Sequence, residues 1–586
     1  MCGIAGILAL SGSRPEADEL SRMTDDLAHR GPDGEGQWIE GPIGLGHRRL
    51  SIIDLETGHQ PMQSTSGRSV ISYNGEIYNY RELRESLRET GSVFATGSDT
   101  EVILALYETH GIAALKKLSG MFAFALWDRE EKRLVLARDR FGIKPLYYTE
   151  SDGRLIFASR IKALRSVASS VDGISPAAVN AYFLRQYIGG ENTIFSGVKR
   201  VMPGQVIEVG DSRLKASYFW TPSSERPRRR STTADRASLK DALSASVRRH
   251  LVSDVPVGLF LSGGIDSTLL LSLACGVSGR APDTFTVDFG TESSSQDAGY
   301  ARLAANQFGS QHHEIRVGID ECLETLPSII AHFDQPLADY ACLPTLVMSR
   351  FARSHVKVVL GGEGADELFG GYKRYRRNLL AETLGPLALR LHHSPPAPLF
   401  KDLRRKELLG DAFVASNDLP SERRISDDVR RFATSGPVNA ALHTDMRSWL
   451  PDNLLSKVDG MSMMASLEAR VPYLDPEVVD LAFRFRGLDK VRPFRLKKLL
   501  RDVSVTEIPE EILNRPKSGF TVPVNKWFQG QLGQQFREIV LGGSAARSWL
   551  NSDAAEKLLT SHQRTGRSGL ELWSILVFAW WIELNA

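Results

Sequence analysis

The sequence predicts two domains of mixed α/β and α+β type: a β-sandwich covered by helices, followed by an α/β domain built on a parallel sheet. Three observations predict this organisation. The 586 residues exceed what one core usually holds. Strand-like segments gather in the first half, with helical segments between them. In the second half, apolar strands end in glycine-rich turns that lead into helices, as is typical of parallel sheets.

The composition indicates a globular protein with small-molecule partners. Hydrophobic residues make up 42% of the chain, and 72 basic against 70 acidic residues give a net charge of +2. This balance gives no reason to expect a nucleic acid or a membrane as partner. The apolar run 573–582 is about half the roughly 20 residues that span a bilayer, and no signal peptide is expected. Four scattered cysteines indicate reduced thiols and a cytoplasmic protein. The sequence is also compatible with a homodimer.

The first half has the pattern of a β-sandwich with helices on its outside. Segments 69–73, 121–127 and 133–137 carry the β-branched, aromatic and apolar residues of strands. Segments 81–90 and 100–109 have helical spacing. The helices are therefore expected to cover the sheets.

Cys2 follows the initiator methionine, and a side chain this small normally allows the methionine to be removed. Removal would place a free α-amine beside a thiol. The amine titrates near pH ~8 and the thiol near ~8.5, so the amine can serve as the general base of the thiol. A cysteine at this position can also be incidental, and the neighbouring motifs decide between the two readings.

Several short motifs follow Cys2 in a fixed order. They are His29–Asp33, Gly46–Ile52, Tyr73–Asn79, Gly97–Glu101, Gly120–Ala125 and Ala137–Leu146. Together with Met1–Gly6 they resemble the N-terminal nucleophile (Ntn) glutaminase domain of the class II amidotransferases, over roughly the first two hundred residues. The resemblance implies the αββα layering of Ntn hydrolases.

Hydrolysis of glutamine through a thioester needs a nucleophile, an oxyanion hole and clamps on the amino acid. The resemblance implies that Cys2 is the nucleophile and that Asn74 and the Gly75 N–H are the oxyanion donors. The implied glutamine-binding residues are Arg49 at the α-carboxylate, Asp99 and the Glu76 backbone at the ammonium group, and Leu50, Ser51, Ile52 and Ile53 around them.

The two domains are expected to span residues 2–215 and 236–586, with a linker at 221–235. The linker is polar, basic and proline-containing. Its arginine run is short and lacks interleaved aromatic residues, so a solvated connection is favoured over a nucleic-acid site.

The second half begins with a strand, a glycine turn and a helix. The apolar run Val255–Leu261 leads into Ser262-Gly263-Gly264-Ile265-Asp266-Ser267, and segment 268–274 is helical. Such a turn offers backbone N–H groups and a positive helix end to an anion. The turn lacks the lysine of a Walker A loop and resembles the pyrophosphate loop of the ATP pyrophosphatases, which cleave ATP to AMP and pyrophosphate.

Two more strands, 284–289 and 356–360, are predicted, and the second leads into the glycine- and acid-rich segment 361–372. Ligands bind at this edge of open α/β sheets, so Asp366 is a candidate Mg²⁺ ligand and Glu363 a candidate acid–base group. The resemblance implies ATP and Mg²⁺ as cofactors. The ATP-binding residues are then Leu261, Ser262, Gly263, Gly264, Asp266, Ser267, Val287, Gly361 and Gly362, and the metal ligands are Asp266 and Asp366.

Four later motifs extend the resemblance over nearly the whole chain. They are Leu454–Met463, Leu467–Asp475, Lys497–Arg501 and Asn514–Phe520. Together with the earlier motifs they resemble asparagine synthetase of the glutamine-hydrolysing type. The resemblance implies conversion of aspartate to asparagine through an acyl-AMP, with Lys497 stabilising charge on the phosphates. It also implies an internal tunnel, because ammonia that reached water would become protonated.

The sequence departs from the family pattern at several positions. Arg160 stands where an acid is usual, which predicts a changed domain contact or ammonia passage. Ala298 and Gln335 replace acids, and Tyr340-Ala341 replaces Pro-Ser, which predicts a changed acceptor pocket. Two alternatives therefore stay open: an amidotransferase that acts on another acid, such as a cell-wall precursor or biosynthetic intermediate, and a non-catalytic glutamine sensor. A β-lactam-forming synthetase would not need the intact Cys2 motif.

Overall fold

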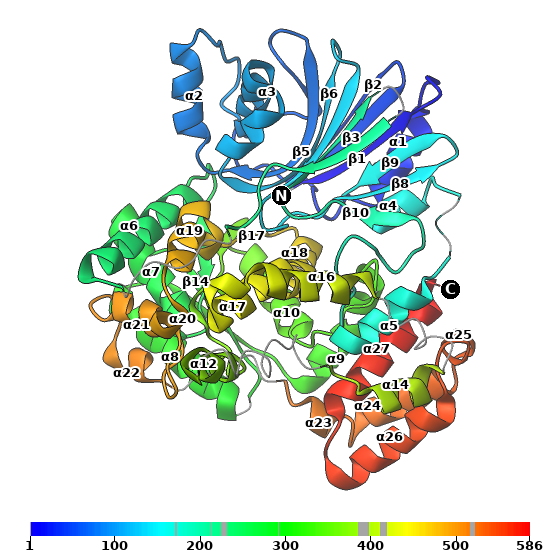
Figure 1. Ribbon diagram of the computed structural model, residues 1–586, viewed down its shortest axis with the longest axis vertical. Coiled ribbons are helices and arrows are strands. Elements are labelled where there is room, and N and C mark those ends of the chain that lie inside the picture. Colours follow the sequence, from blue (N-terminus) through cyan, green and yellow to red (C-terminus); the bar gives the residue numbers. More distant parts are fainter. Residues whose placement is uncertain are drawn as a thin grey trace.

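A computed structural model describes residues 2–169, 171, 173–210, 213–223, 231–290, 292–384, 398–410, 419–515 and 522–585 (Figure 1). Met1, residues 224–230 of the expected linker and residues 516–520 of the motif Asn514–Phe520 lie outside this range. Helix α6 (Thr233–His250) begins inside the expected linker, with Thr232 and Asp235 forming a capping box.

Two six-stranded antiparallel sheets form the first half. One sheet has the order β10-β8-β9-β1-β3-β2 and the other β12-β11-β7-β6-β5-β4. The strands are β1 (Gly3–Ala9), β2 (Gly34–Glu40), β3 (Ile43–Arg49), β4 (Met62–Gln63), β5 (Ser69–Ile77), β6 (Gly120–Asp128), β7 (Arg133–Arg138), β8 (Tyr147–Ser151), β9 (Arg154–Ala158), β10 (Val198–Arg200), β11 (Gln205–Gly210) and β12 (Arg213–Tyr218). Apolar side chains of both sheets, including Ile4, Leu45, Ala123 and Leu134, pack in one core.

Helices cover both outer faces of the sandwich. Helices α1 (Ala17–Asp25) and α4 (Ile161–Arg165) contact the sheet that contains β1, and α3 (Asp99–His110) contacts β5 and packs beside α2 (Tyr80–Glu89) (Figure 1). Strand β6 is buried on both sides because one face meets the other sheet and the opposite face meets helices. The αββα layering predicted from the sequence is confirmed.

A five-stranded parallel sheet, ordered β15-β14-β13-β16-β17, organises the second half. Its strands are β13 (Val257–Phe260), β14 (Thr284–Asp288), β15 (His312–Arg316), β16 (Val358–Leu360) and β17 (Glu468–Arg470). The strand order reverses between β13 and β16, and open α/β sheets bind their ligands at such a switch point. The glycine turn after β13 and the acidic segment after β16 both begin there. The parallel sheet was predicted, but its two edge strands, β15 and β17, were not.

Helices surround this sheet and extend beyond it. They are α7 (Ile265–Ser278), α8 (Glu292–Phe308), α9 (Ile319–His332), α10 (Cys342–Arg353), α11 (Ala365–Phe369), α12 (Tyr375–Leu384), α14 (Asp402–Leu409), α16 (Pro420–Arg431), α17 (Pro437–Arg447), α18 (Ser456–Met464), α19 (Pro476–Arg484), α20 (Gly487–Lys490), α21 (Lys498–Ser504), α22 (Glu510–Asn514), α23 (Val524–Trp527), α24 (Gln531–Phe536), α25 (Ser544–Arg547), α26 (Ser552–Thr565) and α27 (Gly569–Asn585). None of the helices within the described ranges is long and apolar enough to cross a membrane.

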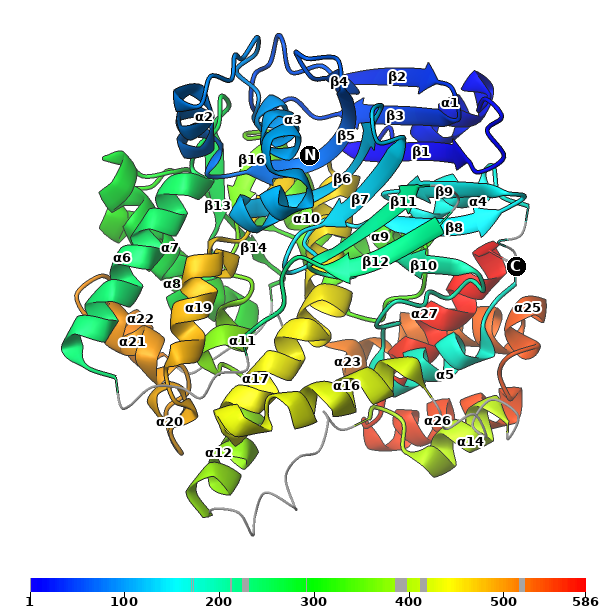
Figure 2. The same ribbon diagram turned by 45° about the horizontal axis from the view of Figure 1, so that its top comes forward.

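The last helix, α27, packs against a helix from the first half of the chain. Helix α5 (Pro176–Arg185), from the first half, lies against the apolar helix α27 (Figures 1 and 2). The Tyr182 ring is 5.7 Å from the Phe578 ring, and its hydroxyl donates to the Ser574 carbonyl at 2.8 Å. The apolar run 573–582 is therefore a core helix, which agrees with its length.

Candidate functional site

Cys2 lies directly before β1 and is buried. The register of β1 with β3 places Gly3 opposite Arg48, which brings Cys2 next to Arg49 and Leu50. Burial raises the pKa of the Cys2 thiol, and a hydrogen bond from the Leu50 backbone and the Arg49 charge offset this only in part. The thiol therefore needs a base in order to act as a nucleophile near neutral pH.

Asn74 and Gly75 lie on β5, on the sheet that faces β1. The Cys2 N–H donates to the Asn74 Oδ1 at 3.0 Å. The Asn74 Nδ2 is buried, and none of the described residues accepts a hydrogen bond from it. A Cβ at Gly75 would lie 2.1 Å from the Met121 carbonyl oxygen, so only glycine fits there. A free, buried donor beside a nucleophile is suited to stabilise an oxyanion.

The residues expected to hold glutamine gather around this point, but Arg49 already has partners. Its guanidinium donates to the carbonyl oxygens of Leu55 at 3.1 Å, Ile53 at 3.3 Å and Asp54. A substrate carboxylate would therefore share the guanidinium with this loop. Leu50 and Ile52 are buried beside it, and the Ser51 N–H donates to the Asp33 carboxylate at 2.9 Å.

Asp99 and Glu76 are both buried acids near the same point. The Asp99 carboxylate accepts from the Ile77 N–H at 2.9 Å and from the Tyr73 hydroxyl at 2.8 Å. Burial raises the pKa of Asp99 above its ordinary value, and these hydrogen bonds offset the increase only in part. The Glu76 carboxylate lies 3.5 Å from the guanidinium of Arg470 on β17, in the other half of the chain. Asp99 therefore has its carboxylate held by Tyr73 and Ile77 near the point where an ammonium group is expected.

The turn after β13 has the geometry of an anion cradle. Gly263 adopts φ +63°, and a Cβ there would lie 2.5 Å from the Ala301 nitrogen. The Ser262 N–H donates to the Ser267 Oγ at 3.2 Å, which ties the turn to the first turn of α7. Arg515, which the sequence reading did not single out, donates to the Gly263 carbonyl at 2.8 Å and lies across the turn.

Lys497 joins the two expected metal ligands. Its ammonium group is 2.6 Å from the Asp366 Oδ1 and also contacts the Asp266 Oδ2. Burial lowers the pKa of Lys497, but the two carboxylates outweigh it and hold the pKa above its ordinary value. At Gly371, a Cβ would lie 1.5 Å from the Asp366 Oδ1 and 2.3 Å from the Lys497 Cε. The packing of this triad therefore depends on glycine.

The same two carboxylates fit a magnesium ion that arrives with phosphates. Mg²⁺ prefers carboxylate oxygens and usually completes its coordination with phosphate and water. No group of three or more potential metal ligands occurs in the described parts of the chain. Asp266 and Asp366 would thus supply the protein ligands, with the phosphates supplying others.

Asp266, Asp366 and Lys497 line one cleft at the switch point of the parallel sheet. Leu261 and Val287 also line it, as do Gly362 and Glu363. Gly361 directly follows β16, and its N–H donates to the Arg470 carbonyl at 2.8 Å. Apolar side chains beside charged ones suit the base and the phosphates of a nucleotide.

Glu363 and Lys457 are two further charged residues of the cleft. The Glu363 Oε2 is buried without a hydrogen-bond partner among the described residues, and burial raises the pKa of this carboxyl. The Lys457 Nζ donates to Asp339 at 3.0 Å. Lys457 was not identified from the sequence, although it lies in the motif Leu454–Met463.

The departures from the family pattern do not all reach this cleft. Ala341 lines it, and Ala298 is buried beside Asp297, which also lines it. The expectation that Gln335 shapes the acceptor pocket stays a prediction: its Oε1 accepts from the Ile194 N–H at 3.2 Å, and Gln335 lines a separate cavity between the halves. Residues 333–337, which follow the end of α9, line this separate cavity.

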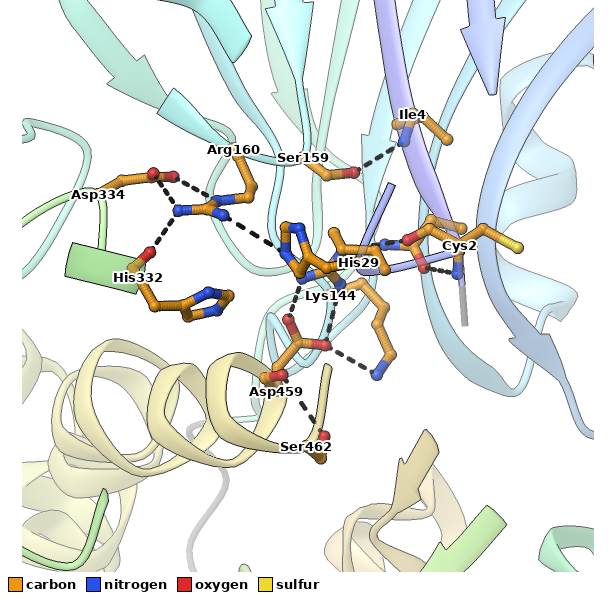
Figure 3. Close-up of polar contacts among 12 residues, drawn as sticks. Cys2, Ile4, His29, Lys144, Ser159, Arg160, His332, Asp334, Asp459 and Ser462 are labelled. Atoms are coloured by element: carbon orange, nitrogen blue, oxygen red, sulfur yellow. Dashed lines mark hydrogen bonds and ion pairs between the residues drawn. The ribbon is translucent and has the colours of Figure 1, made fainter. Parts of the chain in front are cut away.

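Arg160 lies at the same interface, as its departure from the family pattern predicts. Its guanidinium is 2.7 Å from the Asp334 Oδ1 and also contacts the His332 carbonyl (Figure 3). The Ile161 N–H donates to the same Asp334 carboxylate at 2.7 Å. Arg160 thus joins the end of β9 to the segment after α9.

Comparison with known proteins gives matches over the whole chain. The family model described as asparagine synthase matches residues 238–583, and the one described as glutamine amidotransferase domain matches residues 1–220. The chain is 34% identical to asparagine synthetase (glutamine-hydrolyzing) 1 of Bacillus subtilis (strain 168), over 100% of this chain and 97% of that protein. It is 30% identical to asparagine synthetase (glutamine-hydrolyzing) 3 of the same organism, over 89% of this chain and 87% of that protein. It is 28% identical to amidase chyE of Penicillium rubens, over 92% of this chain and 91% of that protein.

Proposed function

Because the chain belongs to the glutamine-hydrolysing asparagine synthetase family of carbon–nitrogen ligases, we propose that it transfers the amide nitrogen of glutamine to a carboxylate activated with ATP. The observation that carries the proposal is that one helix separates two complementary sites. On α18, Lys457 and Val458 line the cleft, while Asp459 bonds to Arg30 beside Cys2.

In the first site, Cys2 attacks the side-chain amide of glutamine, the C–N bond breaks, and a thioester and ammonia form. The α-amine freed by removal of Met1 takes the thiol proton and gives it to the leaving nitrogen. Water then hydrolyses the thioester to glutamate and the free thiol. The Asn74 Nδ2 stabilises the oxyanion, and its free, buried position supports this role. Asp99 and Arg49 hold the two ends of the amino acid.

In the second site, the turn at 262–267 holds the pyrophosphate part of ATP. Asp266 and Asp366 would hold Mg²⁺, which would balance charge on the phosphates when bound. Lys497 moves from these carboxylates to the phosphates during formation of the acyl-AMP. Glu363 accepts a proton from the attacking ammonia, which is consistent with its raised pKa.

Aspartate is the leading acceptor, giving asparagine, AMP, pyrophosphate and glutamate. The names of the Bacillus subtilis relatives support aspartate. A different carboxylic acid is the second candidate. It is favoured by Ala341, which lines the cleft where the family resemblance leads us to expect serine, and by the relative named amidase chyE.

The test is pyrophosphate release with ATP, Mg²⁺ and glutamine, with and without aspartate, followed by mass spectrometry of the products. The intact mass of the protein is measured first, because retention of Met1 would remove the amine base. Asparagine formed with aspartate-dependent pyrophosphate supports the leading acceptor. Pyrophosphate that depends on another acid in a carboxylate panel selects the second candidate. Absence of pyrophosphate with every acid would favour a non-catalytic glutamine sensor.

We further propose that ammonia passes between the sites inside the protein and that the protein acts in the cytoplasm. The short separation of the sites by α18 supports internal passage. A homodimer stays a prediction, which the mass of the native protein in solution would test.

A further inference from the structure

We propose that Asp459 is a positioning residue for glutamine hydrolysis, although it belongs to the other half of the chain. Asp459 fixes the guanidinium of Arg30, and Arg30 fixes the backbone of Cys2. The inference rests on the proposed function of Cys2 as the glutaminase nucleophile.

A continuous set of contacts connects Asp459 to the nucleophile (Figure 3). The Arg30 Nη1 and Nη2 donate to the two Asp459 carboxylate oxygens at 2.9 and 3.2 Å. The Arg30 Nε donates to the Cys2 carbonyl oxygen at 3.1 Å. Arg30 is 2% exposed and Asp459 5% exposed, so water does not compete strongly for these bonds.

The planar guanidinium group of Arg30 couples the position of the Asp459 carboxylate to the position of the Arg30 Nε. Its nitrogen atoms lie in one rigid plane, so two parallel bonds to a carboxylate fix the orientation of the third nitrogen. The Asp459 carboxylate therefore sets where the Arg30 Nε meets the Cys2 carbonyl. A neutral or shifted partner at position 459 would let this nitrogen rotate away.

Cys2 needs such a support because it precedes the first ladder pair of β1, which begins at Gly3. Chain ends fray unless they are tied down. Asn74 holds the Cys2 nitrogen and Arg30 holds its carbonyl oxygen. Loss of the second contact frees one end of the residue, and a misplacement of about 1 Å can cost roughly 100-fold in rate.

Lys144 is the second partner of Asp459. A variant at Lys144 shows whether the charge near Asp459 matters apart from the hydrogen bonds to Arg30. Its Nζ is 3.2 Å from the Asp459 Oδ1, and its side chain is 1% exposed. Lys144 does not bond to the Cys2 backbone in any contact that the structure describes. Replacing it changes the charge near Asp459 while the Arg30 bonds stay.

Asp452 supplies a matched control at the same interface. It pairs with Arg200 at 2.6 Å across the two halves, and both side chains are 2% exposed. Arg200 also donates to the carbonyl oxygens of Gly190 and Ile188, and the described contacts of this pair do not include Cys2. Asp452→Asn therefore weakens a buried ion pair between the halves without touching the nucleophile.

The test compares Asp459→Asn with Asp459→Glu, Lys144→Met and Asp452→Asn. Glutamate release from glutamine is measured without ATP, and 6-diazo-5-oxo-L-norleucine, which alkylates glutaminase nucleophiles, counts the intact sites. For Asp459→Asn we expect kcat per labelled site to fall about 10- to 100-fold, with KM changed less than about threefold. We expect Asp459→Glu to recover part of kcat, and Lys144→Met and Asp452→Asn to stay within about threefold of the wild type.

Arg30→Lys keeps the buried charge and protects the test against a variant that fails to fold. Lysine cannot bond to both Asp459 and Cys2 in the same way, so we expect a similar loss of kcat per labelled site. The inference is overturned if Asp459→Asn and Arg30→Lys retain wild-type kcat, or if Asp452→Asn loses as much. A wild type that releases no glutamate and takes no label would overturn the proposed function as well, which distinguishes the two failures.

Discussion

The two sites of this chain differ in how their polar groups are paired before substrate arrives. Beside Cys2, the Asn74 Nδ2 is a buried donor that no described residue uses. In the cleft, Lys497 is engaged by both Asp266 and Asp366. Glutamine can thus add a hydrogen bond to the first site, whereas phosphates and Mg²⁺ must replace an ion pair in the second. We therefore expect the first site to be preorganised and the second to rearrange on binding.

Replacing the nucleophile should separate the two sites most strongly. For Cys2→Ala we expect glutamate release to fall on the order of 10⁴-fold or more, because the thioester cannot form. Pyrophosphate release with ammonium chloride in place of glutamine should stay within about twofold of the wild type. Cys275→Ala, in α7 of the other half, is the control and should leave glutamate release intact. Loss of the ammonia-dependent reaction in Cys2→Ala would show that the sites are not separable.

Replacing Lys497 should impair the reaction in the cleft and spare the hydrolysis of glutamine. For Lys497→Met we expect pyrophosphate release to fall about 10²- to 10³-fold, because a preorganised positive charge at the phosphates is lost. Glutamate release without ATP should be unchanged. The neighbouring Lys498 pairs with Asp502 instead, so Lys498→Met is the matched control. Equal losses in both variants would contradict the role given to Lys497.

A methyl group at position 371 should test how closely the triad is packed. The Cβ of Gly371→Ala would overlap the Asp366 Oδ1, and overpacking of this kind costs about 1–3 kcal/mol. We expect pyrophosphate release to fall about tenfold and the Mg²⁺ concentration for half-maximal rate to rise. Gly276→Ala on α7 meets no atoms within 4 Å and serves as control. An unchanged Mg²⁺ dependence in Gly371→Ala would place the metal elsewhere.

The smallest expected effect concerns the helix between the sites. Burial raises the pKa of Asp459, but Arg30 and Lys144 outweigh it and hold the pKa below its ordinary value. A carboxyl with a lowered native pKa stabilises the fold above its unfolded pKa of about 3.9, and this contribution is lost as the pH falls through the native pKa. Asp459→Asn keeps an oxygen acceptor and should lower the thermal midpoint by about 2–4 °C at pH 7.

The difference in thermal midpoint between the wild type and Asp459→Asn should be constant from pH 8 to pH 5 and shrink below about pH 4. Thermal unfolding followed by circular dichroism at each pH measures it. A difference that grows as the pH falls would mean that Asp459 is not held ionised by Arg30 and Lys144.

The sequence was sufficient where the signals were local. Predicted strands 69–73, 121–127 and 133–137 lie within β5, β6 and β7, and predicted helices 81–90 and 100–109 coincide closely with α2 and α3. The parallel sheet was predicted because its central strands are apolar and end in glycine turns. Strands β15 and β17 were missed because they are short and carry mostly polar and charged residues, unlike the apolar central strands of the sheet.

Contacts between distant segments could not be foreseen from composition or periodicity. Lys497 meets Asp266 across 231 residues, and only the family resemblance pointed to all three members of the triad. Arg30 and Asp459 are 429 residues apart, and nothing in either motif marks them as partners. The contact of the Gln335 side chain with the Ile194 N–H could not be foreseen either, because the motif of Gln335 continues into the cleft.

We propose that nitrogen released at Cys2 reaches the cleft within the protein. The most direct measurement supplies glutamine labelled with ¹⁵N in its amide group, an equal concentration of unlabelled ammonium, ATP, Mg²⁺ and the acceptor acid. Mass spectrometry then gives the ¹⁵N fraction of the product amide. We expect that fraction to stay well above the ¹⁵N fraction of the ammonium in solution. A product whose label equals that of the surrounding ammonium would contradict the claim.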